Sequence, residues 1–221
     1  MENTQREIII VGGSDQAKAA LDICIDLDLR VFGFFDISCT PGEFINDLQV
    51  FNSTSQFTPI SNFNYILAIG HNYTRLKASN ELRRKLDETH FPSIIHPSAA
   101  VSSSTEIDSG ITIMRNASID HAAELGFGTI INSGSIVSHD VKISSFSSLG
   151  PGAKIAGHTS IGRNSHIGIG ATIIEQCKIG DNVVIGAGAT VINNVPDNSL
   201  AVGTPAKVIR KINYKDNFYK K

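Results

Sequence analysis

The chain has 221 residues, enough for one large domain or two small ones, and its formal net charge is −2. This charge gives no basic footprint for nucleic acid, and no apolar run approaches the roughly 18 residues that a membrane-spanning helix needs. The N-terminal sequence lacks a basic start and a long apolar stretch, so we expect no signal peptide. Together with three cysteines that lack metal-ligand spacing, these features predict a cytoplasmic protein without nucleic-acid or membrane partners.

The first ninety or so residues alternate short apolar runs with helical patterns. The expected elements are strands at residues 7–11, 31–35, 48–51 and 65–70 and helices at about 16–28 and 74–88. Strands that alternate with helices are typical of a parallel sheet. We therefore predict a small Rossmann-like parallel α/β domain over residues 1–92.

Ligands of an open parallel sheet bind at the carboxyl ends of its strands. In this chain those ends carry Gly12, Gly13, Ser14, Asp36 and Gly70. A glycine-rich turn that enters a helix offers backbone N–H groups to a phosphate, and an acidic residue after the second strand can accept a ribose hydroxyl. The turn lacks G-x-G-x-x-G spacing, and Asp15 would repel an anion. A structural turn and a nucleotide site are therefore both open on these residues alone.

From residue 95 to residue 191 every sixth residue is aliphatic, at seventeen consecutive positions. A period of six fits neither an α-helix, at 3.6, nor a plain strand, at 2. It predicts a solenoid of short strands in which three sides close a coil of eighteen residues and the aliphatic side chains point inwards. Small residues and Gly or Asn suit the corners. We therefore predict a β-helix domain over residues 93–221, with a C-terminal cap and tail.

The polar residues that leave this prism at one corner are the candidates for chemistry. His121 and His139 are eighteen residues apart, and the next residue in their column is Gly157, whose lack of a side chain leaves room for a ligand. Asp140 can hydrogen-bond His139, raise its basicity and fix its tautomer, as a general base requires. Asn132 is a further polar candidate. We interpret four other histidines as solvated corner residues: His90, His96, His158 and His166.

A metal site is the main rival use of histidines on such a prism. None of the seven histidines forms the close set that a binuclear or three-histidine site on one chain needs, so we expect no metal. Elemental analysis distinguishes the two readings.

The six-residue pattern resembles the left-handed parallel β-helix of hexapeptide-repeat acyltransferases. With its α/β domain in front, the whole chain is similar to the sialic-acid O-acetyltransferase and nucleotide-amino-sugar N-acetyltransferase family. That family includes the enzymes that N-acetylate UDP- or GDP-linked 4-amino sugars for bacillosamine- and perosamine-type glycans. The motifs that carry the resemblance are Ile-Ile-Ile-Val-Gly-Gly-Ser, Phe-Phe-Asp, Ala-Ile-Gly-His-Asn, residues 132–140 (Asn-Ser-Gly-Ser-Ile-Val-Ser-His-Asp), Leu-Gly-Pro-Gly-Ala-Lys-Ile-Ala-Gly and Gly-Thr-Pro-Ala-Lys.

The resemblance implies the roles of individual residues. It makes His139 the base and Asp140 the residue that raises its basicity, with acetyl-CoA as co-substrate and no metal. It places the coenzyme in a groove between subunits of a homotrimer, against Ser148, Gly157, Ile169 and Ala187. It places the sugar nucleotide on the first domain, at Gly12, Gly13, Ser14, Asp36 and Gly70. Where family members often have Gly and His, this chain has Asp15 and Gln16.

The function implied is that of an acetyl-CoA-dependent N-acetyltransferase. Its acceptor would be the amino group of a UDP-, GDP- or dTDP-linked 4-amino-deoxy sugar that is destined for a surface glycan. An O-acetyltransferase acting on a sugar or on sialic acid would use the same residues. A γ-carbonic-anhydrase-like metal protein and a non-catalytic scaffold are the remaining alternatives.

Overall fold

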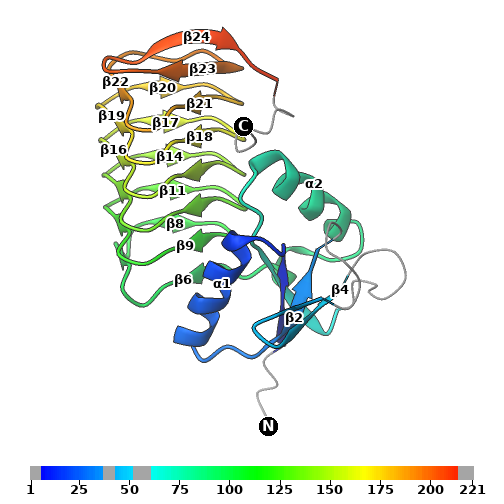
Figure 1. Cartoon of the computed structure of the whole chain (residues 1–221). Coiled ribbons are helices and arrows are strands. Elements are labelled where there is room, and N and C mark those ends of the chain that lie inside the picture. The colour runs from blue at the N-terminus through cyan, green and yellow to red at the C-terminus, as the bar shows by residue number, and fades with distance from the viewer. Residues whose placement is uncertain (1–5, 37–42, 52–60, 214–221) are drawn as a thin grey trace.

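A computed structural model describes residues 6–36, 43–51 and 61–213. It has two parts, a small α/β domain and a long triangular β-helix, and the α/β domain lies beside the lower coils of the β-helix (Figure 1). None of the helices among the described residues is both long and apolar enough to span a membrane.

The α/β domain is built on one five-stranded sheet with the order β3-β4-β2-β1-β5. Its elements are β1 (Glu7–Val11), α1 (Asp15–Asp26), β2 (Val31–Phe35), β3 (Phe44–Ile45), β4 (Leu48–Phe51), β5 (Phe63–Leu67), α2 (Asn72–Arg83) and the 3-10 helix η1 (Glu88–His90). All neighbours are parallel except β3 and β4. The first two strands and β4 match the sequence prediction, whereas β5 ends at Leu67 rather than at residue 70.

The second helix is shorter than its sequence pattern suggests. It ends at Arg83, and a separate turn, η1, covers part of the predicted segment. The Asp87 side chain accepts a hydrogen bond from the Thr89 N–H at 3.0 Å and so caps the new turn. Local capping by an aspartate competes with continuation of the helix, which explains the early end.

Both faces of the α/β sheet are buried. Ile8, Ile10 and Phe34 pack against α1 on one face, and Ile9 and Val11 pack on the other face towards α2. This double coverage explains why β1 is apolar at every central position. Cys24 of α1 is buried, and burial raises its thiol pKa to about 12, as expected for a packing residue. Cys177 is buried in the prism, and Cys39 lies outside the described residues.

The β-helix has three faces of two-residue strands, each strand paired in parallel with the one eighteen residues on. The first face holds β6 (Ile94–Ile95), β9 (Thr112–Ile113), β12 (Ile130–Ile131), β15 (Ser148–Leu149), β18 (His166–Ile167) and β21 (Val184–Ile185). The second holds β7 (Ala100–Val101), β10 (Ser118–Ile119), β13 (Ile136–Val137), β16 (Lys154–Ile155), β19 (Thr172–Ile173) and β22 (Thr190–Val191). The third holds β8 (Glu106–Ile107), β11 (Glu124–Leu125), β14 (Lys142–Ile143), β17 (Ser160–Ile161) and β20 (Lys178–Ile179).

The six-residue aliphatic period forms the core of the prism, as predicted. From Ile113 to Val191 its members are buried in one continuous cluster. Ile95, Val101 and Ile107 are only partly buried because the first coil has no coil beneath it. The sequence pattern therefore gives both the strand positions and the inward face.

From Ile107 to Ile185, the residue three positions after each core aliphatic residue is left-handed and forms a corner of the prism. At two corners these residues are Gly or Asn, with Phe146 as the exception. The corner between the second and third faces, here called the histidine corner, uses Ala122, Asp140, His158 and Gln176 instead, with φ values between 53° and 61°. This conformation is costly for residues with bulky side chains. Side chains at this corner are thus kept despite a backbone that favours glycine.

The C-terminal end closes the prism with a hairpin. β23 (Ser199–Val202) continues the first face in parallel with β21, and β24 (Lys207–Lys211) pairs with β23 in antiparallel fashion. Val195 and Ala201 are buried in the prism core. β24 itself is exposed along its length and forms the last strand of the sheet (Figure 1).

Buried polar side chains hold the two parts together. Arg75 of α2 is fully buried and donates to the carbonyls of Gly128, at 2.8 Å, and Phe146, at 2.9 Å, in the prism. It also donates to the carbonyls of Ile69, at 2.7 Å, and Gly70, at 3.2 Å, in the loop after β5. One guanidinium therefore fixes that loop against two turns of the β-helix.

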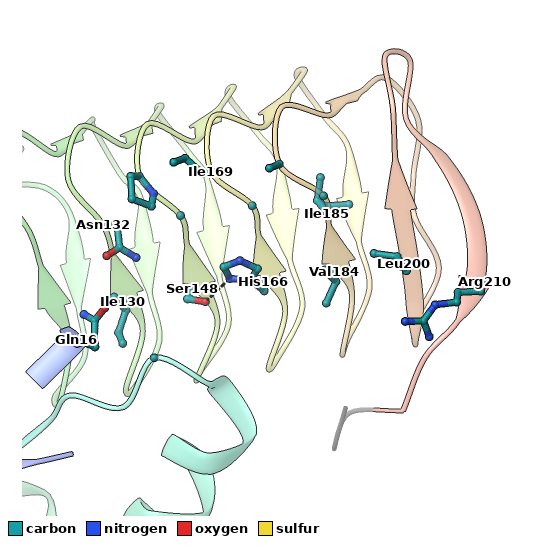
Figure 2. A pocket seen from close by; sticks show the side chains of 16 residues that line it. Gln16, Ile130, Asn132, Ser148, His166, Ile169, Val184, Ile185, Leu200 and Arg210 are labelled. Atoms are coloured by element: carbon teal, nitrogen blue, oxygen red, sulfur yellow. Dashed lines mark hydrogen bonds between the residues drawn. The ribbon is translucent and has the colours of Figure 1, made fainter. Parts of the chain in front are cut away.

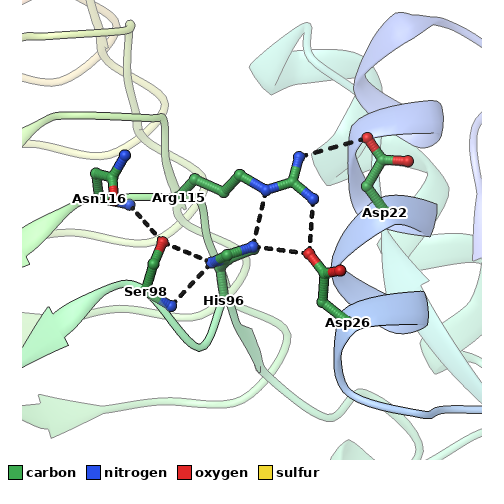
Figure 3. A network of polar contacts seen from close by, with 6 residues as sticks. All are labelled: Asp22, Asp26, His96, Ser98, Arg115 and Asn116. Atoms are coloured by element: carbon green, nitrogen blue, oxygen red, sulfur yellow. Dashed lines mark hydrogen bonds and ion pairs between the residues drawn. The ribbon is translucent and has the colours of Figure 1, made fainter.

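A second contact joins α1 to the first coils (Figure 3). Arg115 lies 2.6 Å from Asp26 and 3.6 Å from Asp22. The Ser98 N–H donates to Nδ1 of His96 at 2.9 Å, the Arg115 Nε–H donates to Nε2 of His96 at 2.8 Å, and this Nε2 also lies 2.8 Å from Oδ2 of Asp26. His96 is buried, and so is His90, whose Nδ1 lies 3.0 Å from Asp87. The interpretation of these two histidines as solvated corner residues is wrong, because both serve packing between elements.

Candidate active site

His139 and Asp140 form a hydrogen-bonded pair at the histidine corner, directly after β13. The Nδ1 of His139 lies 2.9 Å from Oδ2 of Asp140. The hydrogen bond from His139 is the main cause that lowers the Asp140 pKa below its usual value, and the charges of His158, His139 and His121 add to it. An ionised carboxylate at Nδ1 keeps the hydrogen there and leaves the lone pair on Nε2. This arrangement is the one that a general base requires.

Gly157 lies under the ring of His139. A Cβ atom at this glycine would lie 2.6 Å from Cε1 and 2.8 Å from Nε2 of the imidazole. Any larger residue would therefore displace the ring. The open space that the sequence suggested beside Gly157 is occupied by His139 itself.

His158 stands one coil further along the same corner. It is exposed, as expected, and its ring makes an edge contact with that of His139 at a centroid distance of 5.1 Å. Its Nδ1 lies 3.8 Å from the Asp140 carboxylate. Asp140 thus faces two histidines rather than one.

A cavity of about 720 Å³ lies along the first face of the prism (Figure 2), and Gln16 and Gly70 of the α/β domain also line it. We call it the first-face pocket. Several residues singled out from the sequence line it: Gly70, Asn132, Ser148, Ile169 and Ala187. Ser148, Ile169 and Ala187 belong to successive coils, so they follow one another along the axis of the prism. Figure 2 shows this for Ser148 and Ile169. The structure therefore brings candidate substrate and coenzyme residues into one space.

The remaining substrate candidates lie at the carboxyl ends of β1 and β2. Gly12 has φ 127°, a Cβ there would lie 2.6 Å from the Ala68 carbonyl oxygen, and its N–H donates to Phe35 at 2.8 Å. Gly12 is thus required by the tight packing of the turn itself. Gly13 and Ser14 lead into α1, and Asp36 follows β2 with its N–H bonded to the Phe51 carbonyl at 3.0 Å. These residues are not among those that line the first-face pocket.

Sequence reasoning missed His166 as a lining residue. It stands on β18, one coil beyond Ser148, and its Nδ1 lies 2.9 Å from the Ser148 hydroxyl. Burial, followed by the charges of Arg75 and His71, lowers the His166 pKa to about 4, so its imidazole is neutral at pH 7. The interpretation of His166 as a solvated corner residue is wrong. The eighteen-residue step from Ser148 was the signal that pointed to it.

Gln16 is a second lining residue that the sequence marked only as a departure from a family motif. It reaches the first-face pocket from the first turn of α1 (Figure 2). Its Nε2 is buried and has no hydrogen-bond partner among the described residues. A buried donor without a partner costs free energy. The Gln16 amide is therefore a candidate to donate a hydrogen bond to a ligand in the pocket.

Family models match both parts of the chain. The PglD N-terminal domain matches residues 7–82, and the bacterial transferase hexapeptide of six repeats matches residues 158–193. No curated protein sequence matches.

Solved structures match nearly the whole chain. A histidine-to-alanine mutant of GDP-perosamine N-acetyltransferase from Caulobacter crescentus, in complex with CoA and GDP-perosamine, is 28% identical with a TM-score of 0.84, covering 93% of this chain and 97% of that chain. The acetyltransferase domain of PglB from Neisseria gonorrhoeae FA1090, in complex with acetyl coenzyme A, is 30% identical with a TM-score of 0.85, covering 93% of this chain and 100% of that one. WeeI from Acinetobacter baumannii AYE, 21% identical with a TM-score of 0.72 over 92% and 99% of the two chains, shares the fold.

The agreement extends over both domains and over the join between them, which a match to the repeat alone would not give. The chain therefore belongs to the sialic-acid O-acetyltransferase and nucleotide-amino-sugar N-acetyltransferase family, and it is an acyltransferase with a PglD-type α/β domain and a left-handed β-helix.

Proposed function

We propose that this protein transfers the acetyl group of acetyl-CoA to the amino group of a nucleotide-linked 4-amino-deoxy sugar. The nucleotide is UDP, GDP or dTDP, and the product serves surface glycan biosynthesis in the cytoplasm. The observation that carries the proposal is the near full-length similarity to two acetyltransferases, one holding CoA with GDP-perosamine and the other acetyl coenzyme A. The His139–Asp140 pair supplies the base that such a reaction needs.

The proposed reaction depends on the lone pair of Nε2 of His139. The sugar amine attacks the thioester carbonyl carbon, and Nε2 of His139 takes a proton from the amine nitrogen. The C–S bond then breaks, and the coenzyme thiolate recovers that proton from the imidazolium. The products are the acetamide and free CoA. Asp140 stabilises the imidazolium while it exists, and binding of both substrates together makes the attack a positioned one.

The first-face pocket is the proposed coenzyme groove. Ser148, Ile169 and Ala187 line it on successive coils, an arrangement that suits the long pantetheine arm. Gly157 lies under the His139 ring, and we propose that it contributes to the site by letting the imidazole pack closely against its backbone. The chemistry supplied by CoA is that of an activated acyl carrier.

The nucleotide is proposed to bind at the strand ends of the α/β domain. Gly12, Gly13 and Ser14 offer backbone at the start of α1, and Asp36 offers a carboxylate after β2. Gly70 and Asn132 line the first-face pocket, and we propose that they contact the sugar.

We further propose a homotrimer with active sites between subunits. The first-face pocket opens where the first face turns into the second, whereas His139 follows β13 at the next corner. Within one chain, base and pocket are therefore at different corners of the prism. A three-fold arrangement sets the histidine corner of one chain against the pocket of its neighbour, and so completes the site.

The test is the release of free thiol from acetyl-CoA with a panel of UDP-, GDP- and dTDP-linked 4-amino sugars and free sialic acid. Turnover with an amino sugar that is lost in His139→Ala but kept in His121→Ala supports both the reaction and the base. The second variant is a matched control because His121 occupies the same column one coil earlier. A product that mild base destroys would instead identify O-acetylation, and activity of His139→Ala near that of the wild type would remove His139 from the mechanism.

A further inference from the structure

Two histidines and a carboxylate meet at the histidine corner. Oδ2 of Asp140 lies 2.9 Å from Nδ1 of His139 and 3.8 Å from Nδ1 of His158. One potential ligand atom from each residue lies within 4.8 Å of the other two. We propose that these three residues bind a divalent transition metal ion, zinc above all, and that the bound ion switches off the base. The binding stands on geometry alone, whereas the inhibition rests on the role proposed for His139.

The spacing of the three groups suits zinc. Bonds of about 2.0–2.2 Å from a tetrahedral zinc to nitrogen and oxygen put neighbouring ligand atoms about 3.3–3.6 Å apart. The separations in the protein, 2.9 Å and 3.8 Å, lie on either side of this range. Small side-chain rotations that move the ligand atoms by a few tenths of an ångström bring both separations into this range, and the half-exposed side chains are free to make them. Imidazole nitrogens favour zinc over magnesium and calcium, which prefer oxygen ligands alone.

The backbone holds the ligands in place from two consecutive coils. The Asp140 N–H donates to the His121 carbonyl at 3.0 Å, and the His158 N–H donates to the His139 carbonyl at 3.2 Å. Asp140 and His158 are both left-handed, with φ 57° and 56°. At the other two corners this position is mostly glycine or asparagine. The prism thus carries two potential metal ligands, Asp140 and His158, at equivalent left-handed positions of successive coils.

His121 does not complete the set, although it stands in the same column. Its Nδ1 is 2.7 Å from the Ser104 hydroxyl, which engages it on the preceding coil. The site therefore offers three protein ligands and an open fourth position for water. Zinc sites with three protein ligands keep one position open to water, unlike structural zinc sites, which are closed by four protein ligands. Side-chain exposures of 55%, 44% and 57% for His139, Asp140 and His158 give the ion direct access.

Occupation would change what His139 can do. A metal bound at Nδ1 takes the lone pair of that nitrogen, so the hydrogen of the neutral imidazole moves to Nε2. Nε2 then has no lone pair with which to accept the proton of the sugar amine. The ion also takes over the Asp140 oxygen that otherwise supports His139. Zinc would therefore be a reversible inhibitor that competes for the base rather than for either substrate.

The test is a titration of the untagged full-length chain with Co²⁺, whose visible absorption reports tetrahedral binding, followed by displacement with Zn²⁺. The variants are His158→Gln, which removes a ligand, and His121→Gln, the matched control from the same column. We expect about one ion per chain, with affinity lowered at least about tenfold in His158→Gln and within about twofold of wild type in His121→Gln. Thiol release should fall with zinc at the concentrations that displace Co²⁺, and His158→Gln should resist zinc relative to its own zinc-free rate.

Equal affinity in wild type and His158→Gln would overturn the site, as would an equal loss in His121→Gln. Zinc that binds as expected while thiol release continues unchanged would overturn the inhibition. The metal titration decides the site without any acceptor. A chain that binds Co²⁺ through His158 but acetylates no sugar would contradict the proposed function and leave the metal site standing.

Discussion

At the scale of single residues, the charge of the Asp140 carboxylate can be tested separately from its left-handed backbone conformation. Its backbone is left-handed, with φ 57°, a conformation that asparagine adopts as readily as aspartate. Asp140→Asn therefore keeps the turn and removes only the charge that holds the hydrogen on Nδ1 of His139. We expect a loss of about 10²–10⁴ in kcat with an unchanged melting temperature. Thiol-release kinetics and thermal unfolding measure the two; a normal kcat would show that Asp140 does not support the base.

His166 makes stability depend on pH. Its folded pKa is about 4 because of burial, against 6.5 for the free side chain. Between these values the unfolded chain binds more protons, so the stability due to the neutral imidazole is complete above pH 6.5 and is lost as the pH falls to 4. The loss amounts to about 3 kcal/mol. Denaturant unfolding at several pH values should show a shallower decline for His166→Gln, whereas His121→Gln, at an exposed histidine, should decline like the wild type.

At the scale of elements, the helix α2 acts through one buried cation. Arg75→Met would leave the carbonyls of Gly128 and Phe146 without their donor in a buried interface. We expect a loss of about 3 kcal/mol or more in unfolding free energy, because buried unsatisfied acceptors each cost about 1–3 kcal/mol. Arg84→Met, at the C-cap of the same helix, is the control. Its ion pair with Glu81 is exposed, and such pairs contribute at most about 1 kcal/mol.

Denaturant titration of the two variants measures both losses. Equal losses would show that the contacts of Arg75 across the interface do not contribute more than a surface pair. A larger loss for Arg75→Met together with a weaker affinity for CoA would place the Gly70 loop, which the same guanidinium holds, in the coenzyme groove.

The regular elements were predictable because their signals are local. The six-residue period sets which side chains enter the prism, and a two-sided core explains the apolar run Ile8–Val11 of β1. The His139–Asp140 pair was also predictable, because adjacent residues at one corner need no knowledge of distant parts. The first-face pocket was not, since it depends on how the α/β domain, which contributes Gln16 and Gly70, packs against the coils. A fully buried Arg75 gives no sequence signal, because arginine is rarely buried.

Two histidines also show what the sequence pattern alone could not predict. His96 and His166 each lie next to a core aliphatic residue of the eighteen-residue coil. Yet His96 contacts Asp26 on α1, and His166 lines the pocket. Periodicity places a residue on a face but does not say what covers that face. The neighbour is contributed by a domain about seventy residues earlier in the chain in the case of Asp26.

At the scale of the whole molecule, the separation of His139 from the first-face pocket makes a test of the proposed trimer possible. His139→Ala removes the proposed base but leaves the pocket, and Ile169→Asp puts a charge into the pocket but leaves the proposed base. Each variant alone should be inactive. If every site joins the histidine corner of one chain to the pocket of the next, a mixed trimer contains interfaces in which both halves are intact.

The expected recovery follows from counting interfaces. In an equal random mixture, an interface is intact when the base comes from an Ile169→Asp chain and the pocket from a His139→Ala chain, which happens in about one quarter of cases. Co-expression of the two variants should therefore restore about a quarter of the wild-type rate of thiol release, with the trimer confirmed by native mass measurement. Mixtures of trimers that were assembled separately should stay inactive. Inactive mixed trimers would mean that base and pocket serve within one chain, and the site would then have to close around a single prism.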